Sequence, residues 1–183
     1  MINIKMYGLG GQGVVTAGKV FSSAISLYEG KYAITVPSYG HERRGAPVFT
    51  DIIVDDQPVM VNCFVYEPDI VVVLDETIIS KNVDICQGIS DDTTLILNCE
   101  DQDTVDRYKH LGFKKIIYVN ATQIAVASIG VGIPNGAILG ALAKTGIVSI
   151  ESVESAIMDF FGKKAGEKNA KAARISYEQS EKL

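Results

Sequence analysis

The chain has 183 residues, of which 47% are hydrophobic and 21% charged, and this length predicts a single domain, residues 1–183, with a sizeable core. The net charge is −5 and no basic patch stands out beyond Arg43-Arg44 and a lysine-rich tail, which argues against nucleic acid as a partner. No apolar run approaches the roughly 18 residues that cross a bilayer, and the first residues lack the features of a signal peptide. These observations predict a cytoplasmic protein with no membrane partner.

The chain opens with a predicted strand, a glycine-rich loop and a predicted helix. An apolar run at residues 2–7 precedes Gly8-Leu9-Gly10-Gly11-Gln12-Gly13, and residues 14–29 follow with helical spacing of apolar side chains. Glycines allow the backbone to approach a ligand closely, and the start of a helix directs unpaired N–H groups at whatever sits on the loop. Gly10, Gly11, Gln12 and Gly13 are therefore candidates for contact with a ligand or an interface.

The glycine spacing matches the dinucleotide fingerprint, but that fingerprint also needs an acidic residue at the end of the second strand. The predicted second strand, residues 32–36, instead runs into Pro37-Ser38-Tyr39. Nicotinamide or flavin binding is disfavoured for this reason. Two interpretations remain open for the loop: a tight turn that packs a helix on a strand, or a site for an anionic ligand or a partner's backbone.

The remaining pattern predicts alternating strands and helices. Residues 48–54 and 59–63, joined by a short polar turn, predict a β-hairpin. Residues 69–75, 93–99 and 114–120 are apolar and rich in β-branched residues, as in strands covered on both faces. Helices are predicted at 103–111, 121–129, 134–144 and 149–161, and residues 163–183 predict a charged helix or tail that is exposed or rests on a partner. The fold class is α/β, Rossmann-like, with three layers, a mostly parallel sheet, helices on both faces and an inserted antiparallel hairpin.

The three cysteines, Cys63, Cys86 and Cys99, are widely spaced and outside any Cys-x-x-Cys pattern. This predicts buried or half-buried reduced thiols. The chain by itself cannot ligate a four-cysteine iron–sulfur cluster.

The loop between the second and third predicted strands gathers chemically active side chains, namely Tyr39, His41, Glu42, Arg43 and Arg44. Such a loop projects beyond the strand ends, where α/β proteins bind ligands. The guanidinium groups match phosphate or carboxylate oxygens, so coenzyme A, a 2-oxoacid or an acid on a partner are candidate targets. A Glu42–Arg44 interface network is an equally weighted alternative, and a solvated loop with an internal ion pair remains open.

Three other candidate residues, His41, Pro134 and Asn135, have weaker support for a functional role. His41 has no nucleophile or acid beside it in the sequence, which favours a hydrogen-bonding role over a general base. Pro134 and Asn135 start a predicted helix after a second glycine-rich break, and the N–H groups at the start of that helix could contact a partner or a ligand. No residue of the chain is predicted to be catalytic or to bind a metal.

Four motifs in fixed order carry a family resemblance. They are residues 8–13 with Thr16-Ala17, residues 37–47, Glu67-Pro68-Asp69, and Gly132-x-Pro134-Asn135 with Leu139-Gly140-Ala141-Leu142. Together they closely resemble the gamma subunit of 2-oxoacid:ferredoxin oxidoreductases, and residues 39–45 are most similar to the pyruvate-type gamma chains. The resemblance extends from the first strand to about Asn169.

The resemblance implies a subunit of an anaerobic enzyme that oxidatively decarboxylates a 2-oxoacid to an acyl-CoA with ferredoxin as acceptor. It implies alpha, beta and delta partner subunits, with thiamine diphosphate and Mg²⁺ on alpha and beta and iron–sulfur clusters on beta and delta. The gamma chain would hold no cofactor, would pack near the active site and coenzyme A, and would be inactive alone. Two alternatives remain: a free-standing Rossmann nucleotide-binding oxidoreductase, and a pure scaffold domain.

Overall fold

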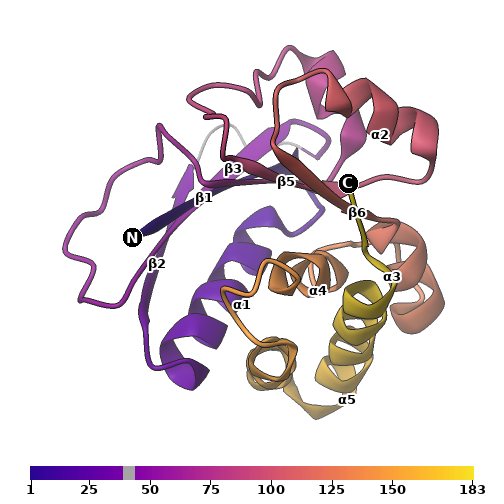
Figure 1. Cartoon of the computed structure of the whole chain (residues 1–183). Coiled ribbons are helices and arrows are strands. Elements are labelled where there is room, and N and C mark those ends of the chain that lie inside the picture. Colours follow the sequence, from indigo (N-terminus) through magenta and orange to yellow (C-terminus); the bar gives the residue numbers. More distant parts are fainter. Residues whose placement is uncertain (39–43) are drawn as a thin grey trace.

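The computed structural model describes residues 1–38 and 44–183, and these residues form a layered α/β fold around one sheet (Figure 1). The strand order is β2-β3-β1-β4-β5-β6-β7. The strands are β1 (Ile2–Leu9), β2 (Tyr32–Ser38), β3 (Pro47–Asp55), β4 (Ile70–Val73), β5 (Thr94–Asn98), β6 (Lys115–Val119) and β7 (Glu181–Lys182). The helices are α1 (Val14–Tyr28), η1 (Glu76–Lys81), α2 (Gln102–Lys109), α3 (Ala121–Ile129), α4 (Ala137–Ala143) and α5 (Ile150–Gln179).

Most strands of this sheet point the same way. β1, β4, β5 and β6 are parallel neighbours, whereas β3 runs antiparallel to β1 on one side and to β2 on the other. β2 therefore points in the same direction as β1, and only β3 and β7 among the described strands run the opposite way. The predicted mostly parallel sheet with an antiparallel insertion is confirmed.

The predicted partner of β3 is wrong. The hairpin was expected between residues 48–54 and 59–63, but β3 pairs with β2 and β1, and residues 58–65 lie outside every strand. Both edges of β3 already carry a ladder of hydrogen bonds, so a third strand has no edge to join. The apolar pattern of residues 59–63 therefore has no place in this sheet.

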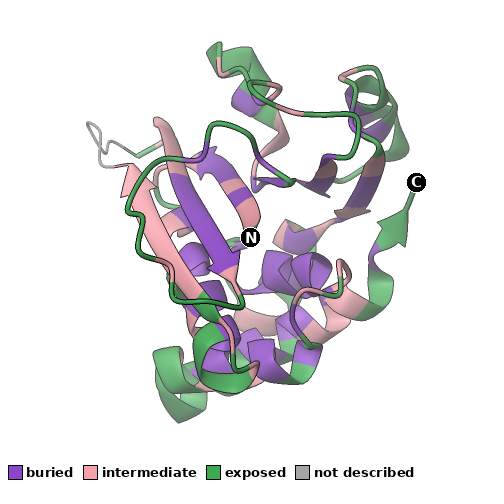
Figure 2. Cartoon of the chain, turned by 60° about the vertical axis from the view of Figure 1, so that its left-hand side comes forward, coloured by how far each residue is buried: buried purple, intermediate pink, exposed green. Residues whose placement is uncertain are grey.

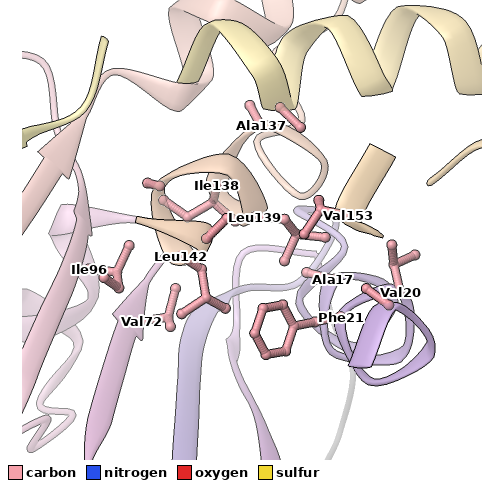
Figure 3. Close-up of a cluster of buried hydrophobic side chains, with 14 of the residues drawn as sticks. Ala17, Val20, Phe21, Val72, Ile96, Ala137, Ile138, Leu139, Leu142 and Val153 are labelled. Atoms are coloured by element: carbon pink, nitrogen blue, oxygen red, sulfur yellow. The ribbon is translucent and has the colours of Figure 1, made fainter. Parts of the chain in front are cut away.

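Alternate side chains of the buried strands point to opposite faces of the sheet, as strand geometry requires. Ile4, Met6, Val72, Ile96 and Ile117 belong to the cluster covered by α1, α3, α4 and α5, part of which is drawn in Figure 3. The strand residues between them, with Tyr7 and Leu95 among them, pack instead under η1 and α2. Figure 2 shows the buried strands between these layers, and the three-layer prediction is confirmed.

The C-terminal helix packs on this chain through one of its faces. α5 is interrupted at Gly162, where φ is 70° and ψ 174°, and its second half lies against α4. Ala170, Ala173 and Ser176 are buried there, and a Cβ on Gly140 would come within 1.9 Å of the Ala173 carbonyl oxygen. The expectation of an exposed segment is wrong for this face, because a narrow stripe of small residues lies between the charged ones. No helix of the described residues is long and apolar enough to span a membrane.

Replacing Gly140 by alanine should lower the free energy of unfolding by about 3 kcal/mol, because the added methyl meets backbone and not a movable side chain. Gly130→Ala is the matched control: its Cβ would meet nothing within 4 Å, and only its φ of 89° is unfavourable, at a cost of about 1 kcal/mol. Urea unfolding of the two variants measures both losses. Equal losses would contradict the close approach of α4 and α5.

Candidate functional site

The glycine loop leaves the start of α1 open. Gly13 precedes the helix in a left-handed conformation, with φ 75°, and no side chain caps the first turn. That turn also contains no acidic residue. The unpaired N–H groups and the positive end of the helix dipole therefore face outward from the loop, which favours a negatively charged group there.

Gln12 fixes the loop to the neighbouring strand. Its Oε1 accepts from the Leu9 N–H at 2.8 Å, and its Nε2 donates to Asp75 Oδ2 at 2.6 Å. Asp75 follows β4 and also caps η1 by accepting from the Thr77 N–H at 2.9 Å. α1 follows β1 and covers one face of the sheet, whereas η1 follows the adjacent strand β4 and covers the other face. The hydrogen bond from Gln12 to Asp75 therefore lies at a topological switch point of the sheet, the usual ligand-binding crevice of open α/β folds.

The second glycine-rich segment, residues 130–136, contacts the first, residues 8–13, through Asn135. Asn135 is 8% exposed, its Oδ1 accepts from the Gly136 N–H at 2.8 Å, and its side chain lies against Gly13, where a Cβ would come within 2.4 Å of Nδ2. Pro134 accepts from the Ile138 N–H at 2.8 Å and so leads into α4. Gly13 and Asn135, which are 122 positions apart in the sequence, thus form one surface, and only glycine fits at position 13.

The segment that enters β3 closes the other side of the loop. The Gly10 N–H donates to the Ala46 carbonyl at 2.8 Å, and the Gly45 N–H donates to the Gly10 carbonyl at 3.0 Å. The exposed Arg44 lies over Gly11, whose Cβ would be 3.7 Å from Arg44 Cγ. Tyr39, His41, Glu42 and Arg43 lie outside the described residues.

Arg44 and the first turn of α1 share an open groove of about 450 Å³. The groove is lined by Leu9, Gly10, Gly11, Gly13, Val14, Val15, Thr16, Arg44 and Val48. Among these lining residues Arg44 carries the only charge, and the helix N-terminus adds a partial positive charge. An anion with an apolar part fits this chemistry.

The groove does not match a dinucleotide site. In the nucleotide-binding folds the second strand lies beside the first, and an acid at its tip holds the ribose. Here β3 lies between β1 and β2, so the end of β2 lies two strand spacings, about 9–10 Å, from β1, where the nucleotide-binding arrangement has one. The Arg44–Ala46 segment occupies the space beside the glycine loop instead.

A second, polar pocket of about 290 Å³ lies beyond the ends of β4, β5 and β6 and was not predicted from the sequence. Asn98 donates from Nδ2 to the Leu74 carbonyl at 2.7 Å and to Thr122 Oγ1 at 2.8 Å, which ties β5 to β4 and to the start of α3. Asp75, Glu76 and Glu100 line the same pocket, so it disfavours anions. The sequence feature that could have indicated this pocket is the set of polar residues at the ends of the buried strands, such as Asp75, Asn98 and Asn120.

The thiols do not form a metal site. Cys63 is exposed, Cys86 half-buried and Cys99 buried, and all three are unpaired. The prediction of burial is therefore wrong for Cys63, because its segment does not join the sheet. Within residues 1–38 and 44–183, no group of three or more His, Cys, Asp or Glu side chains is placed to hold a metal ion. These residues do not fit an iron–sulfur cluster.

The fold and this groove define a class of protein: a Rossmann-like α/β chain whose glycine loop presents an uncapped helix N-terminus and an arginine in place of the dinucleotide fingerprint. Residues 3–179 match the family model described as pyruvate ferredoxin/flavodoxin oxidoreductase. The chain belongs to this family.

Three relatives illustrate the similarity. The common gamma subunit of the pyruvate/ketoisovalerate oxidoreductases of Pyrococcus abyssi is 45% identical over 99% of this chain and 98% of its own. The crystal structure of the pyruvate oxidoreductase subunit PORC of Thermotoga maritima has a TM-score of 0.84 at 37% identity, covering 99% and 97%. A 2-oxoglutarate:ferredoxin oxidoreductase of Magnetococcus marinus, with 2-oxoglutarate, coenzyme A and succinyl-CoA bound, shares the fold at 16% identity with a TM-score of 0.73, over 97% of this chain and 31% of its own. The resemblance to gamma subunits is confirmed.

Gln12→Ala should lower the free energy of unfolding by about 1–3 kcal/mol, because it removes both hydrogen bonds and leaves the Leu9 N–H without its acceptor. Hydrogen exchange at residues 10–13 should become faster in the same variant. Gln87→Ala, at an exposed glutamine, is the control and should change stability by less than about 0.5 kcal/mol. Equal effects of the two substitutions would show that Gln12 does not hold the loop.

Alkylation with iodoacetamide at about pH 8 should modify Cys63 first and Cys99 last, because the thiolate is the reactive form and access limits the rate. Burial, with the nearby Glu76 and Asp101 carboxylates, raises the pKa of the Cys99 thiol to about 12. Burial and Asp84 also raise the pKa of Cys86. Mass spectrometry of the folded chain gives the order, and comparable rates at Cys63 and Cys99 would contradict the structure.

Proposed function

We propose that this chain is the gamma subunit of a 2-oxoacid:ferredoxin oxidoreductase acting on pyruvate, assembled with alpha, beta and delta subunits. The reaction joins the acyl group of the 2-oxoacid to coenzyme A, releases carbon dioxide and passes two electrons to ferredoxin. Family membership and nearly full-length similarity to gamma and PORC subunits support this function. Thiamine diphosphate, Mg²⁺ and the iron–sulfur clusters are assigned to the other subunits, and the chain acts as a single domain.

In this proposal the groove beside the glycine loop binds a phosphate of coenzyme A. The observation that carries it is the position of the Arg44 side chain and the uncapped N-terminus of α1 on the same groove. A guanidinium offers two parallel N–H donors to phosphate oxygens, and the amides of the first helical turn offer further donors. Leu9, Val14 and Val48 provide apolar lining for the uncharged part of such a ligand.

The chain contributes binding and orientation to the reaction, not a catalytic group. Gln12 and Asn135 hold the backbone of the loop, so that its N–H groups are already directed at the groove when the ligand arrives. Tyr39, His41, Glu42 and Arg43 belong to the same proposal as ligand or interface residues, on the basis of the sequence alone. The chain without its partners is expected to be inactive.

Arg44→Ala in the assembled complex should raise the KM for coenzyme A by about 10- to 100-fold, the loss of one charge-assisted interaction of about 1.5–3 kcal/mol, with little change in kcat. Arg44→Lys keeps the charge but loses the planar fork and should fall between Arg44→Ala and the unmodified enzyme. Steady-state rates of ferredoxin reduction at varied coenzyme A and pyruvate concentrations give both constants.

The matched control for this series is Arg107→Ala. Arg107 lies on α2, on the opposite face of the sheet, and donates to Thr104 Oγ1 at 2.7 Å. It should leave both Michaelis constants unchanged. Unaltered constants in Arg44→Ala would remove the coenzyme A assignment and favour the pure scaffold role. A rise in the KM for pyruvate alone would assign the guanidinium to the 2-oxoacid carboxylate instead.

A further inference from the structure

Residues 58–66 have the composition of a strand but form none. Their sequence is Pro-Val-Met-Val-Asn-Cys-Phe-Val-Tyr, and residues 58–65 carry no regular secondary structure. Between Val59, which is half-buried, and the buried Val65, the large apolar side chains face solvent. Met60 is 89% exposed and Tyr66 70%, while Val61 and Phe64 are each 46% exposed. Soluble chains rarely expose so many neighbouring apolar side chains unless another surface covers them.

The main chain of this segment is also unpaired. Among the residues that the structure describes, none of residues 58–64 forms a hydrogen bond with another part of the chain. An extended stretch with unpaired N–H and C=O groups can pair with another chain as an added strand. A conflict between local strand preference and the observed fold is expected at functional surfaces.

The segment is nevertheless held in place at its C-terminal end. Val65 donates its N–H to Asp51 Oδ2 at 3.1 Å, and its carbonyl accepts from Lys5 Nζ at 2.8 Å. Asp51 is 1% exposed and lies 3.5 Å from the same ammonium group. A Cβ on Gly88 would come within 1.7 Å of the Tyr66 carbonyl oxygen, so the backbone there packs closely on residues of the η1–β5 connection. The exposed part is thus presented from a fixed point on β1 and β3.

Charge indicates what kind of chain covers it. The segment is flanked by four carboxylates, Asp55, Asp56, Glu67 and Asp69, of which Asp55 pairs with the Met1 ammonium group and Asp56 with Lys31, and the whole chain carries a net charge of −5. A second copy of the chain would bring the same carboxylates to the contact, which electrostatic repulsion disfavours. A partner that presents lysine or arginine beside an open sheet edge is complementary in charge and in hydrogen bonding.

We propose that residues 58–66 are the docking strand of this chain, which adds to a basic, open sheet edge of a partner subunit in the same oxidoreductase. The inference rests on the proposed function, because the partner belongs to that complex. The side chains of Met60, Phe64 and Tyr66 fill apolar sites on that subunit, and the backbone of residues 59–64 pairs with its edge strand.

Hydrogen-exchange mass spectrometry compares the isolated chain with the co-expressed, purified complex. The amides of residues 59–64 should exchange freely in the isolated chain and slow by about tenfold or more in the complex, as paired strands do. Alkylation of Cys63 should slow in parallel, while Cys86 reports on the chain away from the contact. Free exchange of residues 59–64 within an intact complex would overturn the inference.

A double substitution, Met60→Asp with Phe64→Asp, tests the apolar part. It should weaken retention of this chain in the complex by at least about tenfold, because it places charges where apolar groups are buried. Its melting temperature as an isolated chain should fall only slightly, since Met60 is 89% exposed and Phe64 46%. Leu27→Asp, at a leucine of α1 that is 68% exposed, is the matched control and should leave assembly intact.

The outcomes separate the two proposals. An active complex in which the segment exchanges freely, or in which the double variant assembles normally, overturns the docking strand and leaves the proposed function standing. Protection that appears in the isolated chain and grows with its concentration assigns the segment to a second copy and also overturns it. Failure to obtain any complex with co-expressed alpha, beta and delta subunits removes the proposed function and this inference together.

Discussion

The side-chain amide of Gln12 joins the end of β1 to the end of β4, and the geometry of the site depends on this connection. Its oxygen accepts from the Leu9 N–H and its nitrogen donates to Asp75, so the loop is held on both sides of the switch point. Gly13 can then turn with a positive φ against Asn135, and α1 begins with its N–H groups uncovered. A half-buried polar group that lost its partner here would cost stability, so the two hydrogen bonds of Gln12 help to hold the loop.

The site also shows how an acidic chain can offer a place for an anion. The net charge is −5, yet the groove beside the glycine loop contains a guanidinium and a helix N-terminus and no carboxylate among its lining residues. The carboxylates gather elsewhere, around the polar pocket beyond β4 to β6 and beside residues 58–66. The local potential at the groove can therefore be positive although the chain as a whole is acidic.

Much of the fold could be predicted from periodicity and caps, because these are local properties. The strand, glycine loop and helix at the N-terminus, the buried central strands, helix α3 and the Ser149 cap of α5 were all expected where they occur. The partner of β3 was not, since strand pairing depends on which edges are already occupied, and the sequence pattern of residues 59–63 is that of a strand in either case. The buried face of the charged last helix could not be recognised from the sequence, because it consists of small or polar residues such as Ala170, Ala173 and Ser176 rather than large apolar ones. The candidate loops were identified correctly as neighbours of strand ends, but the hydrogen bond from Gln12 to Asp75 joins residues 63 positions apart and could not be read from either motif.

We infer that the open first turn of α1 receives a phosphate of coenzyme A in the assembled enzyme. Hydrogen exchange of the Val14, Val15 and Thr16 amides, measured in the complex with and without coenzyme A, tests it most directly. Exchange should slow by about tenfold or more at these amides, because their N–H groups gain acceptors, with no change at the start of α3. Unchanged exchange at α1 under saturating coenzyme A, or protection confined to α3, would contradict it.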